Sequence, residues 1–259
     1  MKSVSKEKLT EILETIASPE LAEEYDSERI GFVLDMMPDE AEIKKIAVCL
    51  DVTEKVLTDA AKFKADVLIC HHNPIFHPTS KIGFELSKKL KIAFDNNISI
   101  YCMHTNFDKA ESGTNDALSR IVGLKDVELL KIGAVGYVEK QSLDSFAKHV
   151  SNKLKTTLVY VGENPVEKVA VCGGSCFNKD FLKIAESLNV DTIISSELKH
   201  SDVLRERENM NLIDAGHYPT ENPGMESLKK QITEFQILDE ENILFIHDDI
   251  DLKAVQFVG

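Results

Sequence analysis

The chain has 259 residues, of which 43% are hydrophobic, and its formal net charge is −14. This length and apolar content support a buried core, arranged as one large α/β unit or as two smaller units. The negative charge argues against non-specific nucleic-acid binding, which depends on Lys and Arg side chains that neutralise phosphates. No run approaches the roughly 20 apolar residues of a membrane helix. Residues 1–17 lack the apolar stretch of a secretory signal, so we expect a cytoplasmic protein without membrane association.

The first part of the chain alternates strand patterns with helix patterns. The predicted elements are a strand at 46–51 (IAVCLD), a helix at 53–65, a strand at 66–70 (DVLIC), a helix at 83–97 and a strand at 98–104 (ISIYCMH). Thr53 can cap the first of these helices. Such alternation implies parallel strands, and sites in parallel sheets lie beyond the carboxyl ends of the strands.

A second alternation of this kind begins near residue 142. Its predicted elements are a helix at 142–154, strands at 156–162 and 168–173, a helix at 178–189, a strand at 191–195, a helix at 197–209 and a strand at 211–215. Residues 122–141 are predicted to link the two parts, because Gly133 and Gly136 permit tight turns. We therefore expect two similar halves, residues 1–125 and 126–259, packed closely as two domains or as one.

Histidines and carboxylates follow three of the predicted strands. These residues are His71 and His72 after the second strand, His104 and Asp108 after the third, and His217 and Glu221 after the last. Strand ends that converge on one edge would bring them together as nitrogen and oxygen ligands for metal. The predicted fold is therefore α/β, with two similar β/α halves whose mixed, largely parallel sheets pack around a central dinuclear metal site.

The types of donor restrict the metal and its contacts. Imidazole and carboxylate together suit two divalent transition-metal ions (Zn, Fe, Mn, Co or Ni) better than calcium or magnesium. Pro219 disfavours α conformation at Tyr218, so we expect His217 to end a strand or loop. Thr220 can then cap a helix that holds Glu221 in its first turn. A carboxylate held there can bridge two ions, which makes Glu221 our candidate bridging ligand.

A series of motifs runs along nearly the whole chain. It begins with LAEEYDSERIGFVL and continues through LDVTEKVL, HHNPIF, HTNFDKAESGTND and CGGSC to SSELKHSD and DAGHYPTE. In this order the motifs resemble the Nif-three-like dinuclear-metal-centre family, some of whose members are named GTP cyclohydrolase I type 2 homologues. The resemblance implies that the metal ligands are His71, His72, Asp108, His217 and Glu221. It places His104 just outside this set, where a histidine can orient a ligand or a bound water.

The resemblance also implies a homo-oligomer, a closed ring of six subunits with the metal sites facing an internal cavity. The length matches the short form of the family, without an inserted domain. Tyr25 and Ser27 stand where the family usually has tryptophan and asparagine, from which we expect altered local packing alone. In SSELKHS, Ser196 replaces a glycine, Ser201 takes a histidine position and His200 lies one residue earlier. We expect His200 to line the mouth of the site.

Two glycine-containing motifs have structural interpretations. GTND at 113–116 is either an anion-binding turn or a helix start, and we favour the helix start. The spacing of Cys172 and Cys176 in CGGSC suits neither a zinc knuckle nor a thioredoxin-like pair. We expect Gly173 and Gly174 to form a strand-to-helix turn near the substrate. Since the chain has five cysteines, an odd number, and three lie in apolar strand patterns, we expect reduced cysteines without a disulfide.

Two classes of function use the same ligands. Two bound ions would acidify a water into a nucleophile, and the chain has neither a G-x-S-x-G elbow nor a P-loop. The leading hypothesis is a metal-dependent hydrolase of a nucleotide or phosphorylated metabolite, with Glu221 and His104 in catalytic roles. Since two ions bring more charge than Asp108 and Glu221 return, the substrate can be an anionic small molecule. The alternative is a metal-handling protein or regulatory scaffold without turnover.

Overall fold

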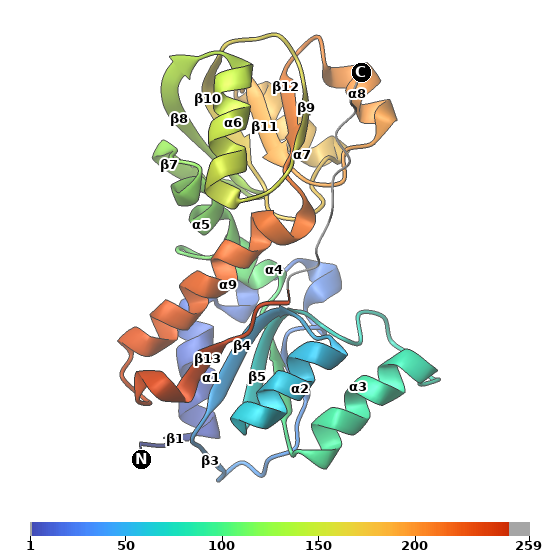
Figure 1. The fold of residues 1–259 in the computed structure, drawn as a ribbon, viewed down its shortest axis with the longest axis vertical. Coiled ribbons are helices and arrows are strands. Elements are labelled where there is room, and N and C mark those ends of the chain that lie inside the picture. Colours follow the sequence, from blue (N-terminus) through green and yellow to red (C-terminus); the bar gives the residue numbers. More distant parts are fainter. Residues whose placement is uncertain (1, 249–259) are drawn as a thin grey trace.

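The computed structural model describes residues 2–248, which form an α/β fold with two main sheets in two lobes (Figure 1). A five-stranded sheet lies in the lower lobe of the figure and a six-stranded sheet in the upper lobe. A small antiparallel pair, β1 (Val4–Ser5) with β3 (Glu42–Ile43), lies at the edge of the lower lobe. Within residues 2–248, no helix combines the length and apolar character needed to cross a membrane. The predicted fold class is confirmed.

The five-stranded sheet is mostly parallel. In spatial order its strands are β13 (Ile243–Phe245), β4 (Ile46–Asp51), β5 (Val67–His72), β6 (Ser99–Cys102) and β2 (Gly31–Leu34). The first four run parallel, and β2 is antiparallel to β6. Because β4 and β5 are buried on both faces, both are nearly continuous apolar runs, as expected for central parallel strands.

Helices cover both faces of this sheet. They are α1 (Lys6–Ile16), α2 (Glu54–Phe63), α3 (Phe84–Asp95) and α9 (His217–Glu234). α2 and α3 pack on one face, whereas α1 and α9 pack on the other. As predicted, Thr53 caps α2: its hydroxyl accepts a hydrogen bond of 3.2 Å from the backbone N–H of Val56. The central strands of this sheet are therefore covered by helices on both faces.

The six-stranded sheet has parallel strands flanked by antiparallel ones. Its order is β7 (Lys125–Leu129), β8 (Ala134–Gln141), β10 (Val166–Val171), β11 (Thr192–Ser195), β12 (Asn211–Asp214) and β9 (Val159–Val161). Three strands, β10, β11 and β12, are parallel, and the other three pair antiparallel. The helices of this lobe are α6 (Leu143–Leu154), α7 (Lys179–Ser187) and α8 (His200–Glu206). α6 packs on one face of the sheet and α7 on the other.

Residues 122–141, predicted as a link, instead form most of a hairpin in the second sheet. β7 and β8 pair antiparallel through the turn at Gly133, whose φ is +75°, and β8 then pairs with β10. The prediction was wrong because the glycines mark a turn inside the sheet, and the buried residues of β8 complete its core.

The last described strand, β13, belongs to the first lobe. α9 descends from the upper lobe across the molecule, and β13 then pairs parallel to β4 (Figure 1). The division into residues 1–125 and 126–259 stays a prediction, and positions 249–259 lie outside the described residues. α9 contacts β4 of the first sheet and α5 at the junction between the lobes, and it carries two of the predicted ligands, His217 and Glu221.

Short helices complete the junction between the lobes. α4 (Thr105–Lys109) and α5 (Thr114–Ile121) lie there, and α5 packs against α9. The predicted helix start in GTND is confirmed, since α5 begins at Thr114 directly after Gly113. Within the part of the chain that the structure describes, three short 3-10 helices occur, at Pro19–Leu21, Glu24–Asp26 and Glu240–Asn242.

Candidate metal centre

The ends of two parallel strands deliver the first group of predicted ligands. His71 and His72 are the last residues of β5, and their ring centroids lie 5.0 Å apart. His104 follows β6, and Asp108 lies one turn later on α4. The expected convergence at the carboxyl edge of the sheet is therefore present.

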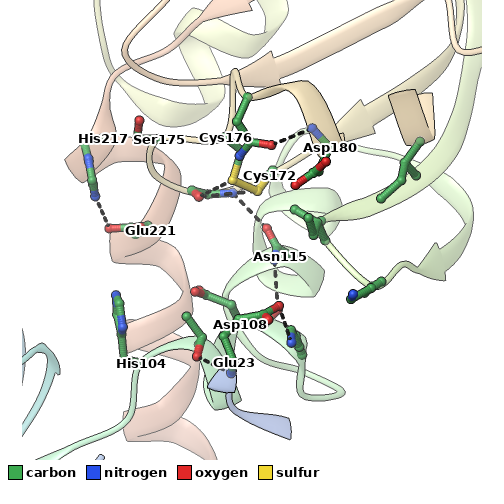
Figure 2. Close-up of a pocket in the computed structure, with 18 of the residues that line it drawn as sticks. Glu23, His104, Asp108, Asn115, Cys172, Ser175, Cys176, Asp180, His217 and Glu221 are labelled. Carbon is green, nitrogen blue, oxygen red and sulfur yellow. Dashed lines mark hydrogen bonds and ion pairs between the residues drawn. A yellow bond between two sulfur atoms is a disulfide. The ribbon is translucent and has the colours of Figure 1, made fainter. Parts of the chain in front are cut away.

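The second group of predicted ligands lies on α9, where one prediction was wrong. We expected His217 to end a strand or loop, but it is the first residue of the helix and follows Gly216, whose φ is +84°. Pro219 is tolerated there because the backbone N–H groups of a first turn have no partner within the helix. Thr220 is consequently not the cap; its hydroxyl donates to the carbonyl groups one turn earlier. Helical spacing places Glu221 one turn beyond His217 (Figure 2).

Glu221 lies between the imidazoles of both groups. Its Oε2 is 3.0 Å from His217 Nε2 and 3.3 Å from His72 Nε2, whereas its Oε1 is 3.9 Å from His71 Nε2. Asp108 Oδ1 approaches His71 Nε2 from the other side at 3.4 Å. The structure thus brings together all five predicted ligands, and Glu221 has the position that a bridging carboxylate requires.

Four histidines at the centre share one arrangement. In each, Nδ1 contacts an oxygen at 2.8 Å: Met103 O for His71, Asp51 for His72, Asp26 for His104 and Glu197 for His217. An acceptor at this nitrogen holds a proton on Nδ1, so that Nε2 is the nitrogen that binds a metal, in place of a proton where it carries one. Metal-binding histidines are usually oriented in this way.

The sequence analysis did not identify the three carboxylates that orient these histidines. Asp51 ends β4 and is the register partner of His72 on β5, so a carboxylate ending the neighbouring parallel strand was a usable signal. Asp26 lies in the motif LAEEYDSERIGFVL, and Glu197 lies in SSELKHSD. The motifs contain Asp26 and Glu197, but a motif does not show which histidine each carboxylate contacts.

Charges in the centre are strongly coupled. Burial lowers the pKa of His71 to about 3, so this imidazole is neutral. Burial opposes a charge on His72 as well, but hydrogen bonds to two carboxylates prevail and raise its pKa to about 10. A hydrogen bond to Glu221 raises the pKa of His217 to about 9. Burial raises the pKa of Asp108; for Glu221, hydrogen bonds from the imidazoles outweigh burial and keep its pKa below the usual range.

These donors fit a metal centre. Two buried atoms that lie 3.4 Å apart, His71 Nε2 and Asp108 Oδ1, have no hydrogen-bond partner. Each such atom costs about 1–3 kcal/mol, which ligation of a cation would offset. Two sets of donor atoms also lie within 4.8 Å of one another: His71, His72 and His104, and His72, His217 and Glu221. Imidazole with carboxylate suits the predicted transition metals.

His104 lies beside the predicted ligands. Its ring centroid is 4.9 Å from that of His71 and 5.7 Å from that of His72. Asp26 is fully buried, and its carboxylate accepts hydrogen bonds from the Thr105 backbone and hydroxyl as well as contacting His104. His104 is thereby held firmly at the edge of the centre, where it can serve as a proton carrier or as a further donor.

The centre opens into a pocket of about 810 Å³ between the two lobes. Both lobes contribute to its wall, the lower one through His72, His104 and Asp108, and the upper one through the turn between β10 and α7. His200 is not among the described residues that line this pocket. It is exposed at the start of α8, so the prediction for His200 was wrong.

Cys172 and Cys176 form a disulfide in the pocket wall, contrary to the expectation of reduced cysteines (Figure 2). The C-x-x-x-C spacing was dismissed because it fits no common redox motif. Gly174, with φ +69°, turns the chain so that the second sulfur meets the first. Cys49, Cys70 and Cys102 are free and buried, as expected. The expected strand-to-helix turn at Gly173 and Gly174 is confirmed.

Fold and site together define an α/β protein with a candidate histidine–carboxylate metal centre between two sheets. Residues 4–250 match the family model of Duf34/NIF3 (NGG1p interacting factor 3), and the chain belongs to this family. A GTP cyclohydrolase 1 type 2 homolog of Methanocaldococcus jannaschii is 32% identical over 236 residues, which cover 86% of this chain and 92% of that protein.

Solved structures show the same fold. A Bacillus cereus protein related to NIF3 superposes with a TM-score of 0.88 at 20% identity, covering 98% of this chain and all of that one. Reduced HcgD from M. jannaschii superposes with a TM-score of 0.81 at 28% identity, covering 94% of this chain and 98% of that one.

Proposed function

We propose that the protein is a dinuclear metal-dependent hydrolase that acts on a nucleotide or another phosphorylated metabolite. The observation that carries the proposal is the convergence of imidazole nitrogens and carboxylate oxygens at a pocket, among them His71 Nε2 and Asp108 Oδ1, which have no hydrogen-bond partner. His71 and Asp108 would hold one ion, His72 and His217 the other, and Glu221 would bridge them. The names of several relatives, GTP cyclohydrolase 1 type 2 homolog, support the substrate class.

When bound, two divalent ions would lower the pKa of a coordinated water and polarise the substrate. The chain's own residues would do the rest. Glu221, nearly enclosed and between three imidazoles, would fix the spacing of the site. Asp26 would hold His104 with one ring nitrogen free, so that this imidazole can accept a proton from the attacking group and return it to the leaving group.

The far side of the pocket suits an anionic substrate. Lys109 lines the pocket but is neutralised by Glu23 at 2.6 Å. Lys131 and Lys183 also line it and have no ion-pair partner among residues 2–248. In a chain of net charge −14, two unpaired lysines facing a metal centre favour a phosphate on the substrate.

Aromatic side chains at the pocket offer a surface for a base. Phe76 and Tyr25 both line the pocket, with 39% and 59% of their surfaces exposed. Arg29 lies over the ring of Phe76 at 4.4 Å and so stabilises its orientation. Tyr25, from which we expected an effect on packing alone, therefore bears on ligand binding.

The location and assembly of the protein remain proposals. We propose a cytoplasmic location, and the family resemblance supports a homohexamer with the metal sites facing an internal cavity. Light scattering at micromolar concentration should give the mass of six chains, and a monomer would refute the ring.

Metal content and turnover test the proposal together. Elemental analysis should find close to two transition-metal ions per chain, because the five ligands supply two incomplete shells. With manganese, zinc, iron or cobalt, a panel of nucleotides and phosphate esters should show turnover that is lost in Asp108→Ala and Glu221→Ala. Turnover in His104→Ala should be reduced but present, since this residue moves protons without being required to hold the ions. Formate release from GTP would identify the cyclohydrolase reaction.

A matched pair of double variants tests the anionic substrate. Lys131→Ala with Lys183→Ala should raise KM for a phosphorylated substrate by about tenfold with little change in kcat. Lys148→Ala with Lys153→Ala removes the same charge from α6, outside the pocket, and should leave both constants unchanged. Equal effects of the two pairs would contradict a phosphate subsite.

The alternative function is metal handling without turnover, and it is favoured by the same ligands. A carrier should transfer its metal rapidly to a chelator or an apo-protein, whereas a catalyst should retain it. No turnover of any substrate in the panel, combined with rapid transfer, would overturn the hydrolase proposal in favour of the carrier.

A further inference from the structure

We propose that Cys172 and Cys176 are a reversible thiol–disulfide pair whose oxidation state sets the metal affinity of the neighbouring centre. Their Cα atoms are 6.0 Å apart, a usual separation for a disulfide. Both cysteines line the pocket that holds the candidate ligands (Figure 2). The inference rests on the metal-binding part of the proposed function and is independent of turnover.

The pair is open to a reductant. Cys172 is 3% exposed, whereas Cys176 is only partly buried and faces the pocket. The other cysteines, Cys49, Cys70 and Cys102, are fully buried in the first sheet. A small thiol that enters the pocket therefore meets Cys176 first.

Reduction by a dithiol balances in two exchanges. A thiolate of the dithiol attacks Cys176 Sγ, the sulfur–sulfur bond breaks, and Cys172 leaves as a thiolate that takes up a proton. The second thiolate of the reductant then displaces Cys176, which is also protonated, and the reductant becomes a disulfide. Two electrons and two protons have moved to the protein. The freed Cys176 thiol has an acceptor in place, because its sulfur lies 3.3 Å from Gly173 O.

This disulfide contributes less to the fold than one that closes a longer loop. It joins residues separated by four positions, and closing so short a ring stabilises the folded state by about 2 kcal/mol. The cores of both lobes consist of apolar clusters from other elements. The bond can therefore open and close while the protein stays folded.

The ring of residues 172–176 supports Glu221 directly. Gly174 lies against Glu221: a Cβ at Gly174 would overlap Glu221 Oε1 and reach 3.1 Å from Glu221 Cδ. The N–H of Gly174 also donates to Thr220 Oγ1, one residue before Glu221, at 3.0 Å. Backbone of the ring thus forms the wall behind the bridging carboxylate.

The same ring is linked to Asp108 through one side chain. The N–H of Gly173 donates to Asn115 Oδ1 at 2.8 Å, and Asn115 Nδ2 donates to Asp108 O at 2.9 Å (Figure 2). One turn of the upper lobe therefore supports ligands carried by two separate helices, α4 and α9.

Opening the disulfide allows the backbone of residues 172–176 to move. Two adjacent glycines have the greatest backbone freedom of any residues, and the closed ring restricts that freedom. In the reduced protein, the backbone at Gly174 no longer holds Glu221 in one position, and the affinity for metal falls. The loss should be about tenfold, the lower end of the effect of removing a contact that orients a ligand.

Titration with Mn²⁺ alone tests the proposal. Manganese prefers oxygen and imidazole to thiol, so the freed cysteines add little binding of their own. Wild-type protein is oxidised with glutathione disulfide or reduced with a phosphine, freed of reagent, and checked by mass after alkylation of its thiols. Unbound Mn²⁺ is then counted by electron paramagnetic resonance, and the reduced protein should show a Kd about tenfold higher.

Two variants serve as controls. Cys172→Ser with Cys176→Ser should show the Kd of the reduced wild type under both conditions. Cys176→Ser alone changes only the partly exposed position and should show the same Kd. It replaces the double variant if that protein folds poorly. Circular dichroism confirms that each variant is folded.

Equal Kd values for the two states of the wild type would overturn this inference alone. Tighter binding by the reduced protein, failure of the two cysteines to oxidise, or a redox response that persists in the serine variants would also overturn it. Absence of Mn²⁺ binding in both states would refute the proposed metal centre itself, and the two failures are therefore distinguishable.

Discussion

Gly174→Ala is a sharp test of how the upper lobe supports the centre. The added methyl group would overlap Glu221 Oε1 and lie 3.1 Å from His217 Nε2. Since non-bonded carbon atoms settle roughly 3.5 Å apart, the carboxylate must move by about 1 Å or more. A shift of this size should lower metal affinity by about 10- to 100-fold, as when a contact that orients a ligand is lost.

Alanine at position 174 also destabilises the backbone, and this loss of stability must be measured separately from the steric effect of the methyl group on Glu221. Gly174 has φ +69°, a conformation that costs alanine about 1 kcal/mol. Gly31→Ala is the matched control, because Gly31 has φ +85° and no atom within 4 Å of an added Cβ. Both variants should lower Tm by about 2–4 °C. Only Gly174→Ala should lose metal affinity.

Calorimetric titration with Zn²⁺ or Mn²⁺ measures the affinity, and thermal unfolding of the metal-free proteins measures the backbone cost. Wild-type affinity in Gly174→Ala would show that Glu221 does not depend on this turn. An equal loss of affinity in Gly31→Ala would assign the effect to general destabilisation and would contradict the argument.

Three further predictions follow from the same geometry. Asp51→Asn should lower metal affinity about tenfold, because His72 loses the charged partner of its Nδ1, whereas Asp59→Asn on the surface of α2 should not change it in the same titration. Removing metal with a chelator should lower Tm by about 5–10 °C in a thermal scan, with an unchanged circular dichroism spectrum, since ligand binding at 100-fold excess over Kd contributes about 2.7 kcal/mol. Phe146→Ala should reduce the free energy of unfolding by about 3–5 kcal/mol in a urea titration, because the side chain of Phe146, on α6, is fully buried, while metal affinity of the folded protein is retained.

The sequence by itself determined the central parallel strands, most of the helices that follow them and the residues that converge. The apolar runs before His71 and His104 identify buried parallel strands, whose carboxyl ends meet at one edge. The four-residue spacing of His217 and Glu221 is typical of one helix face, but Pro219 led us to expect His217 in a strand or loop, and this prediction was wrong. These features are local or follow from a general rule of topology, and the ordered motifs added the family.

Only the tertiary structure showed how these residues are supported. Asp26 contacts His104 across 78 positions of the chain, and Glu197 contacts His217 across 20, so no local pattern contains either pairing. The hairpin of β7 and β8 was predicted as a linker because glycines are as typical of linkers between domains as of tight turns within a sheet. The return of β13 to β4 likewise depends on where α9 leads the chain.

The disulfide illustrates the reason most clearly. Spacing alone did not reveal that Cys172 and Cys176 meet, because the meeting depends on the positive φ of Gly174 and on the packing of the turn against Glu221. Periodicity and strand ends are set by each residue's neighbours in the chain. Side-chain orientation, by contrast, is set by neighbours in space, and these are decided when the two lobes close around α9.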